Sequence, residues 1–133
     1  HMDTKAKQYV HIINQVSYSE LKYWYKGAVL FVYPALAEGF GIPPIEAAAA
    51  GIPCVCSNRT AMGDFTFFDK NLVDPCDDML LKDRILQSLN LVGNSNVVAI
   101  QHQIYQRYNW ESIAKKLYQE LKNRFNDCCF SEV

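Results

Sequence analysis

The chain has 133 residues, half of them hydrophobic and a fifth of them charged, which is typical of one globular domain with its own core. The formal net charge of −1 excludes the class of nucleic-acid-binding proteins that depend on bulk positive charge. No apolar run approaches the roughly 18 residues that cross a bilayer, and no secretory signal is visible. The five cysteines, spaced C-x-C and C-C with one apart, fit neither a zinc site nor a disulfide framework. We therefore expect no metal and a reducing, cytoplasmic location.

The first part of the chain predicts one strand and one helix. Residues 9–13 form an apolar run typical of a short buried strand, and residues 14–16 are the turn after it. Ser17 and Glu20 have the spacing of a capping box, which predicts a helix that ends near Lys26. The apolar residues of this helix recur at helical spacing, so we expect them to face the core: Leu21, Trp24, Tyr25 and Ala28.

Two further strands and a short helix follow. Residues 28–33 are apolar throughout, as in a strand of a parallel sheet that helices cover on both faces. After a loop, a helix is predicted from about residue 44 to residue 50, and residues 52–57 are predicted to form the next strand. Cys54 and Cys56 lie in this strand, where we expect them to be small buried core residues.

The rest of the chain is mainly helical. A polar and aromatic connection covers residues 58–70, and a short fourth strand is predicted at 71–75. Three helices follow at 77–90, 94–108 and 109–125, and Asp77 can cap the first of them. This order of elements predicts a Rossmann-like, doubly wound α/β fold in which helices flank a parallel sheet.

The chain contains no repeat, low-complexity segment or linker, so we expect one domain. Residues 1–2 are interpreted as a cloning remnant, residues 3–126 as a partial Rossmann-like domain, and residues 127–133 as a disordered tail. In open α/β sheets, ligands bind beyond the carboxyl ends of the strands. The loops at 14–16, 38–43 and 57–58 all follow predicted strands, and we expect them to form a binding site at one edge of the sheet.

The densest pattern in the chain is E-G-F-G-I-P-P-I-E, from Glu38 to Glu46. Two carboxylates flank a glycine-rich loop that leads into a helix. The N-terminus of a helix offers unpaired N–H groups and a positive dipole end to a phosphate, and glycines let a ligand approach the backbone closely. Carboxylates accept hydrogen bonds from sugar hydroxyls, and we expect Glu46 in the first helical turn to accept a vicinal pair. The pattern therefore predicts a site for a sugar and an anion.

The spacing by itself leaves a second interpretation open. Two glutamates eight positions apart also occur by chance, and the helix dipole alone favours an acidic residue in a first turn. Other polar residues have simple structural interpretations: Arg59 as a solvated loop residue that could reach a phosphate, His11 as structural and His102 as a surface residue.

The longer string from Pro34 to Val55 resembles the retaining glycosyltransferases of family 4 (group 1), which have the GT-B fold. Their mark is an E-x7-E motif of the form E-G-F-G-L-P-x-x-E-A, followed by G-x-P-V-V. The similarity extends outward: residues 16–28 resemble the family segment V-S-x-E-E-L-x-x-L-Y-x-x-A, and residues 108–111 resemble F-S-W-E. Nearly the whole chain is covered by this resemblance.

The resemblance implies the C-terminal, donor-binding half of a two-domain enzyme that uses no cofactor and no metal. Such enzymes transfer a glycosyl group, with retention, from a nucleotide-diphosphate sugar to a glycan or lipid-linked acceptor. Glu46 would bind the ribose, and Glu38, the catalytic candidate, would contact the transferred sugar. The resemblance also implies a set of donor-binding positions, in which the glycine-rich loop holds sugar and diphosphate and residues 14–16 border the base: Gly39, Phe40, Gly41, Ile42, Asn14, Gln15, Val16 and Asn58.

The chain also departs from the family pattern. Family members carry an Arg and a Lys on an earlier stretch and bind the acceptor with an N-terminal domain. Both precede the first residue here, so we expect this chain alone to be inactive and its uncovered apolar surface to allow a homodimer. Gly63 and Asp64 replace a Pro and a Glu of the family, which leaves the contacts of that loop open.

The intact enzyme is expected to work in polysaccharide or lipid-linked glycan synthesis, with peripheral association at the inner face of the plasma membrane. Two alternatives stay open: a nucleotide-sugar-binding or interaction module without transferase activity, and another GT-B enzyme such as an epimerase. The E-G-F-G string argues against the epimerase.

Overall fold

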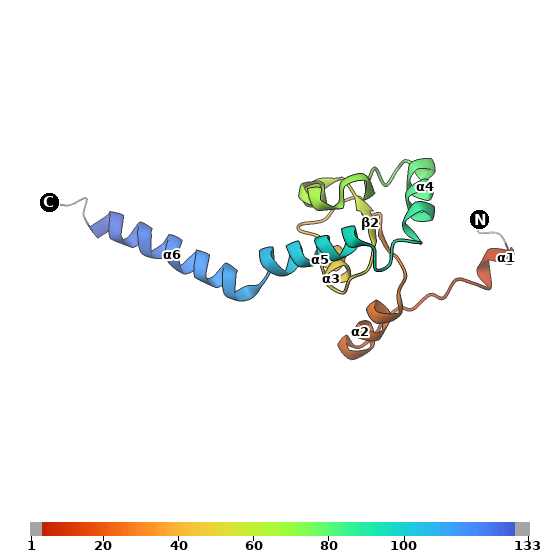
Figure 1. Cartoon of the computed structure of the whole chain (residues 1–133), viewed down its shortest axis with the longest axis horizontal. Coiled ribbons are helices and arrows are strands. Elements are labelled where there is room, and N and C mark those ends of the chain that lie inside the picture. The colour runs from red at the N-terminus through yellow and green to blue at the C-terminus, as the bar shows by residue number, and fades with distance from the viewer. Residues whose placement is uncertain (1–3, 130–133) are drawn as a thin grey trace.

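The computed structural model describes residues 4–129, with side chains described to residue 125. A parallel sheet lies at the centre of a rounded body, and a long C-terminal helix extends away from that body (Figure 1). The sheet consists of β1 (Phe31–Tyr33), β2 (Cys54–Ser57) and β3 (Leu72–Val73), in that order. Phe31 pairs with Cys54, and Cys56 pairs with both Tyr33 and Leu72. The mixed α/β architecture with a parallel sheet is confirmed.

Several helices accompany this sheet, and some of them pack against it. The described α-helices are α1 (Thr4–Lys7), α2 (Tyr18–Gly27), α3 (Ile42–Ala49), α4 (Asp78–Ser88), α5 (Ser95–Arg107) and α6 (Trp110–Cys129). The connection after β2 contains two 3₁₀-helices, η1 (Thr60–Asp64) and η2 (Thr66–Asn71). No helix within residues 4–129 combines the length and the apolar character that crossing a bilayer requires.

The core is built around β2. All four of its residues are buried, as expected for a central parallel strand that is covered on both faces. Cys54 and Cys56 are buried as predicted, and burial raises the pKa of the Cys56 thiol to about 12, so this thiol stays protonated. The side chains that pack around them come from α3, the connection after β2 and α5: Ala47, Ala48, Met62, Phe65, Phe68 and Ile104.

The predicted caps of α2 and α4 are confirmed. The Ser17 hydroxyl accepts from the backbone N–H of Glu20 at 3.3 Å, while the Glu20 carboxylate accepts from the backbone N–H of Ser17 at 2.8 Å. Asp77 caps α4 by accepting from the N–H of Leu80 at 3.0 Å. These local signals fixed the helix starts correctly because each cap is formed by residues close together in sequence.

The strand predicted at 9–13 is wrong. This segment is extended but pairs with no strand in the described part of the chain, and Tyr9 and Ile12 are exposed, as is His11. A β-strand is stabilised by hydrogen bonds to a neighbour, so an apolar run without a paired neighbour does not form one. The predicted inward face of α2 is confirmed only in part. Tyr25 and Ala28 are half-buried and pack against the core, whereas Trp24 is 54% exposed.

Several boundaries also differ from the prediction. The strand predicted at 28–33 is shortened to β1, and α3 begins at Ile42 rather than at Pro44. Prolines are compatible with a first helical turn because N–H groups there need no intrahelical partner. At the other end, the backbone of α6 runs to Cys129, and the predicted tail at 127–133 stays a prediction. Residues 1–3 and 130–133 lie outside the described residues.

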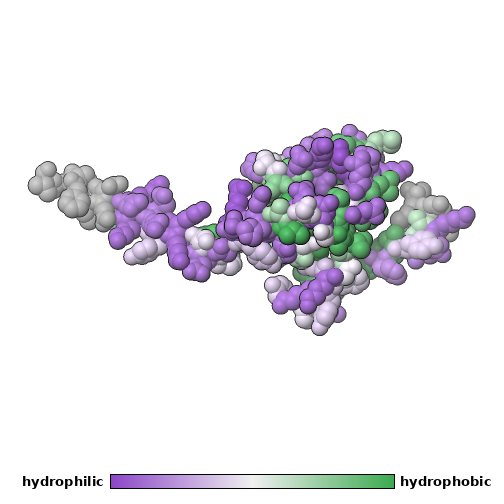
Figure 2. Space-filling view, viewed as in Figure 1, coloured by the Kyte–Doolittle hydropathy of each residue, from purple (hydrophilic) through white to green (hydrophobic). Residues whose placement is uncertain are grey.

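Helix α6 projects from the body and is mainly hydrophilic on the face that Figure 2 shows. Hydrophobic residues gather instead on the rounded body in this view. Some apolar residues of α6 nevertheless recur at helical spacing and are exposed: Ile113, Leu117, Leu121 and Phe125.

An ion pair joins the carboxyl ends of β2 and β3. Arg59 donates from Nε to Oδ1 of Asp74 at 3.1 Å and from Nη2 to Oδ2 at 2.8 Å. The backbone N–H of Cys76 donates to the same carboxylate. Arg59 is therefore a paired loop residue rather than a freely solvated one. The Arg59 guanidinium and this backbone hydrogen bond hold the pKa of Asp74 below its ordinary value of 3.8.

We expect the Asp74→Asn substitution to lower stability in a pH-dependent way. Because the pKa of Asp74 is lower in the folded state, its contribution is complete above its ordinary pKa of 3.8 and is lost as the pH falls through the lowered value. Urea unfolding should show a difference from the parent chain at neutral pH that shrinks as the pH falls below 3.8. Asp64→Asn, in the neighbouring loop, is the control, and an effect of Asp74→Asn that does not vary with pH would contradict the ion pair.

We expect the Gly41→Ala substitution to destabilise the fold. Gly41 has φ 90°, and a Cβ atom there would lie 2.8 Å from Cγ of Met62 and 3.1 Å from Cε2 of Phe65. Strain and overpacking should lower the free energy of unfolding by about 1–3 kcal/mol. Gly39 is the matched control in the same loop, because a Cβ atom there meets no atom within 4 Å. Equal losses for the two variants in urea unfolding would show that the contact with Met62 is unimportant.

Candidate functional site

Glu38 lies in the loop that follows β1, and two hydrogen bonds hold it there. Its carboxylate accepts from the hydroxyl of Tyr33, the last residue of β1. Its backbone N–H donates to Oγ1 of Thr60 at 3.0 Å, and Thr60 lies in the connection after β2. The structure therefore brings the loops that follow β1 and β2 together, as the parallel sheet predicted. The bond to Glu38 raises the pKa of Tyr33, so the hydroxyl stays a donor.

Glu46 lies in the second turn of α3, not in the first turn as predicted, because this helix begins at Ile42. Its exposed carboxylate accepts from the hydroxyl of Tyr25 on α2 at 3.2 Å. Burial of the Tyr25 ring and the nearby Glu46 charge raise the pKa of Tyr25 to about 12. Each glutamate of the motif therefore has its own tyrosine donor.

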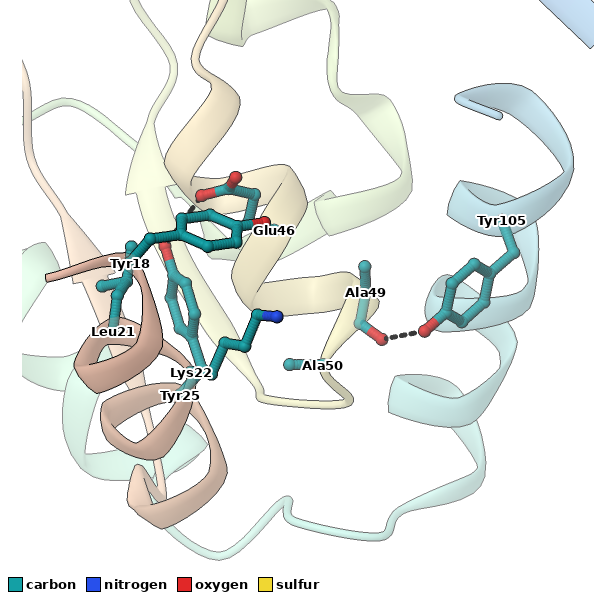
Figure 3. A pocket seen from close by; sticks show the side chains of 8 residues that line it. All are labelled: Tyr18, Leu21, Lys22, Tyr25, Glu46, Ala49, Ala50 and Tyr105. Carbon is teal, nitrogen blue, oxygen red and sulfur yellow. Dashed lines mark hydrogen bonds between the residues drawn. The ribbon is translucent and has the colours of Figure 1, made fainter. Parts of the chain in front are cut away.

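A pocket of about 370 Å³ lies beside Glu46, between α2, α3 and α5 (Figure 3). The Lys22 side chain extends into the space between α2 and α3, and the Tyr105 hydroxyl donates to the backbone oxygen of Ala49 at 3.0 Å. A carboxylate, an ammonium group and aromatic rings together suit a ligand with hydroxyls, a planar ring and negative charge. The residues that line the pocket are Tyr18, Leu21, Lys22, Tyr25, Glu46, Ala49, Ala50 and Tyr105.

The glycine-rich loop ends at Gly41, whose left-handed conformation starts α3. No side chain of the described residues caps this helix, so the backbone here is not covered by a capping hydrogen bond. Pro43 and Pro44 have no N–H group, which leaves the amides of residues 39–42 as the donors that an anion could use. Phe40 anchors the loop, because its ring contacts Phe65 and Tyr108 at centroid distances of 5.7 and 5.8 Å.

The other predicted donor-binding residues lie in the segment before α2, at the end of β2 and at the start of α3. Asn14 and Gln15 are exposed and Val16 is half-buried, in the extended segment before α2, and none of them lines the pocket beside Glu46. Asn58 lies at the carboxyl end of β2, where its N–H donates to the backbone oxygen of Val73 at 2.9 Å. Ile42 is exposed at the start of α3. Their roles in donor binding stay predictions.

Gly63, one of the departures from the family pattern, has a structural reason. A Cβ atom at this position would lie 2.7 Å from the backbone oxygen of Asn58. The close approach of η1 to the end of β2 therefore requires a residue without a side chain. Among the described residues, no three His, Cys, Asp or Glu side chains gather as a metal site would need.

Comparisons with known proteins agree with this architecture. The model of the glycosyl transferases group 1 family matches residues 3–96, well over half of the chain. The chain is 38% identical over 81 residues to O-antigen chain mannosyltransferase B of Escherichia coli, a match that covers 61% of this chain and 21% of that protein. It is 46% identical over 77 residues to O-antigen chain mannosyltransferase RfbU of Salmonella typhimurium, covering 58% of this chain and 22% of that protein.

A plant protein shows similarity as well. Sucrose-phosphate synthase of Zea mays is 40% identical over 70 residues, which is 51% of this chain and 6% of that protein. The chain spans about a fifth of the length of the two mannosyltransferases, and no solved structure gives a significant match. Since the family model covers the sheet, both motif glutamates and helices α2 to α4, the chain belongs to the glycosyl transferases of group 1.

Proposed function

We propose that this chain binds the donor of a retaining glycosyltransferase that transfers a mannosyl group from a nucleotide-diphosphate sugar to a glycan or lipid-linked acceptor. One observation carries the proposal. The Glu46 carboxylate borders the pocket between α2 and α3, while Glu38 lies at the other end of the glycine-rich loop. The names of the two bacterial mannosyltransferases support the choice of sugar.

Each part of the proposed donor has a matching group on the chain. Glu46 would accept hydrogen bonds from the two ribose hydroxyls, with the base in the adjoining pocket. The amides of residues 39–42 would donate to the diphosphate and the sugar, and Glu38 would accept from hydroxyls of the transferred sugar. Hydrogen bonds of this charged kind contribute about 1.5–3 kcal/mol each, so a few of them would fix the donor.

The proposed reaction breaks the bond between the sugar and the diphosphate oxygen and forms a bond to an acceptor oxygen on the same face. The sugar passes through an oxocarbenium-like state, and the leaving phosphate takes the acceptor proton. The proposal includes no cofactor and no metal, in line with the resemblance to family 4 enzymes. In this proposal, the chain is part of the C-terminal half of a GT-B enzyme at the cytoplasmic face of the membrane, and a second domain binds the acceptor.

We expect substitutions of the two glutamates to have different effects on binding, measured by calorimetry with GDP and GDP-mannose. Glu46→Gln should weaken both ligands at least tenfold, because it removes the charge that the ribose hydroxyls contact. Glu38→Gln should leave GDP binding unchanged and remove only the additional affinity that the mannosyl group gives.

Glu120→Gln on α6 is the matched control, because it removes the same charge from an exposed position far along the chain. UDP and UDP-glucose test the choice of base and sugar. GDP-mannose binding that is insensitive to Glu46→Gln would exclude the ribose assignment. Specific binding without any transfer, when the chain is part of its full-length parent, would favour the alternative of a binding module without transferase activity.

A further inference from the structure

We propose that Tyr25 and Tyr33 are positioning residues that hold the carboxylates of Glu46 and Glu38 in the orientations that donor binding requires. The proposal rests on the proposed function, and it adds to that function the groups that orient the two acidic side chains. Neither tyrosine would touch the donor. Each would act through the glutamate that accepts its hydroxyl hydrogen bond.

The two hydrogen bonds cross between different elements of the fold. Tyr25 lies on α2 and donates to Oε2 of Glu46 on α3, at 3.2 Å. Tyr33 ends β1 and donates to Oε1 of Glu38 in the following loop. A glutamate side chain has three rotatable bonds, and on an exposed helix or loop it samples several rotamers. One hydrogen bond to a fixed donor selects among these rotamers.

The two donors are themselves linked through one ring. Phe31 contacts Tyr25 at a centroid distance of 5.9 Å and stacks on Tyr33 at 6.0 Å with an interplanar angle of 15°. Phe31 is fixed in turn by its pairing with Cys54 in the buried strand β2. The ring contacts of Phe31 with Tyr25 and Tyr33 therefore tie both hydroxyl donors to the sheet.

Glu38 has a second anchor in its backbone. Oγ1 of Thr60 accepts from the N–H of Glu38 and donates to the backbone oxygen of Arg59 at 2.8 Å. Thr60 has φ 55°, which is unusual for a β-branched residue and costs conformational energy. The side chain of Glu38 is thus held by the end of β1, and its backbone is held by the connection after β2.

The chemistry of the hydroxyl fits this positioning role. A tyrosine hydroxyl has one proton, and it gives this proton to one oxygen of the carboxylate. The other oxygen, and the remaining lone pairs of the first, stay available to accept from sugar hydroxyls. Both tyrosines have raised pKa values, so they remain protonated donors at neutral pH.

The first test examines the hydrogen bonds without any ligand. The pKa values of Tyr25 and Tyr33 would be measured by NMR in chains with ¹³C-labelled tyrosine. Glu46→Gln should lower the pKa of Tyr25 and leave the pKa of Tyr33 unchanged. Glu38→Gln should lower the pKa of Tyr33 and leave the pKa of Tyr25 unchanged. If neither substitution changes its tyrosine, the hydrogen bonds are absent in solution and the proposal fails.

The second test measures GDP and GDP-mannose binding to Tyr25→Phe and Tyr33→Phe chains, whose rings keep the contacts with Phe31. Tyr25→Phe should weaken both ligands roughly threefold to tenfold, and Tyr33→Phe should weaken only GDP-mannose, by a similar factor. Tyr23→Phe is the control, since Tyr23 lies on the same helix and is 73% exposed. Thermal unfolding should be close to that of the parent chain for all three variants.

A double-mutant cycle separates positioning from a general structural effect. If each tyrosine acts through its glutamate, Tyr25→Phe should cause no further loss in a Glu46→Gln chain, and Tyr33→Phe none in a Glu38→Gln chain. If the losses of affinity are additive in a chain that binds GDP-mannose, the positioning role is overturned while the proposed function stands. Failure of the parent chain to bind GDP-mannose would instead overturn the proposed function, and with it the role of the tyrosines in donor binding.

Discussion

The central strand β2 is paired on one side with β1 and on the other with β3, and all four of its residues are buried. Parallel pairing places the carboxyl ends of the three strands at one edge of the sheet. The Glu38 loop, the connection with Arg59 and Thr60, and the segment with Asp74 all leave the sheet at this edge. The contacts between these loops, from Glu38 to Thr60 and from Arg59 to Asp74, exist because the register of the sheet brings them within reach.

The parts of this fold that could be predicted are those specified by residues close together in sequence. The capping box at Ser17, the cap at Asp77 and the apolar run around Cys54 each gave an element at the right place. The run at 9–13 looks equally apolar, but a strand depends on a partner elsewhere in the chain, and the described sheet provides none. The 3₁₀-helices escaped prediction because such short turns have no periodic pattern to recognise.

The candidate site likewise contains residues that the sequence pattern could identify and residues that only the structure reveals. Glu38, Glu46 and the glycines between them could be recognised because the pattern is contiguous. The helical spacing assigns Tyr25 to the core, where its ring does pack, but this pattern does not reveal that its hydroxyl donates to a carboxylate. Tyr33 was simply part of an apolar strand. Only the tertiary placement of α2 against α3, and of β1 against the Glu38 loop, identified the two hydroxyls as donors.

In the proposed function, the charges of the site constrain how a nucleotide-diphosphate sugar can bind. Two carboxylates beside an anionic diphosphate repel it, and Arg59 is already paired with Asp74. The glutamates can therefore favour binding only if they face the neutral, hydroxyl-bearing ends of the donor. The loop amides between them must then face the diphosphate. This order of groups, carboxylate, amides and carboxylate, matches the order ribose, diphosphate and sugar along the donor. A carboxylate free to rotate toward the diphosphate would oppose binding, which is the physical reason for the positioning role that we propose for the two tyrosines.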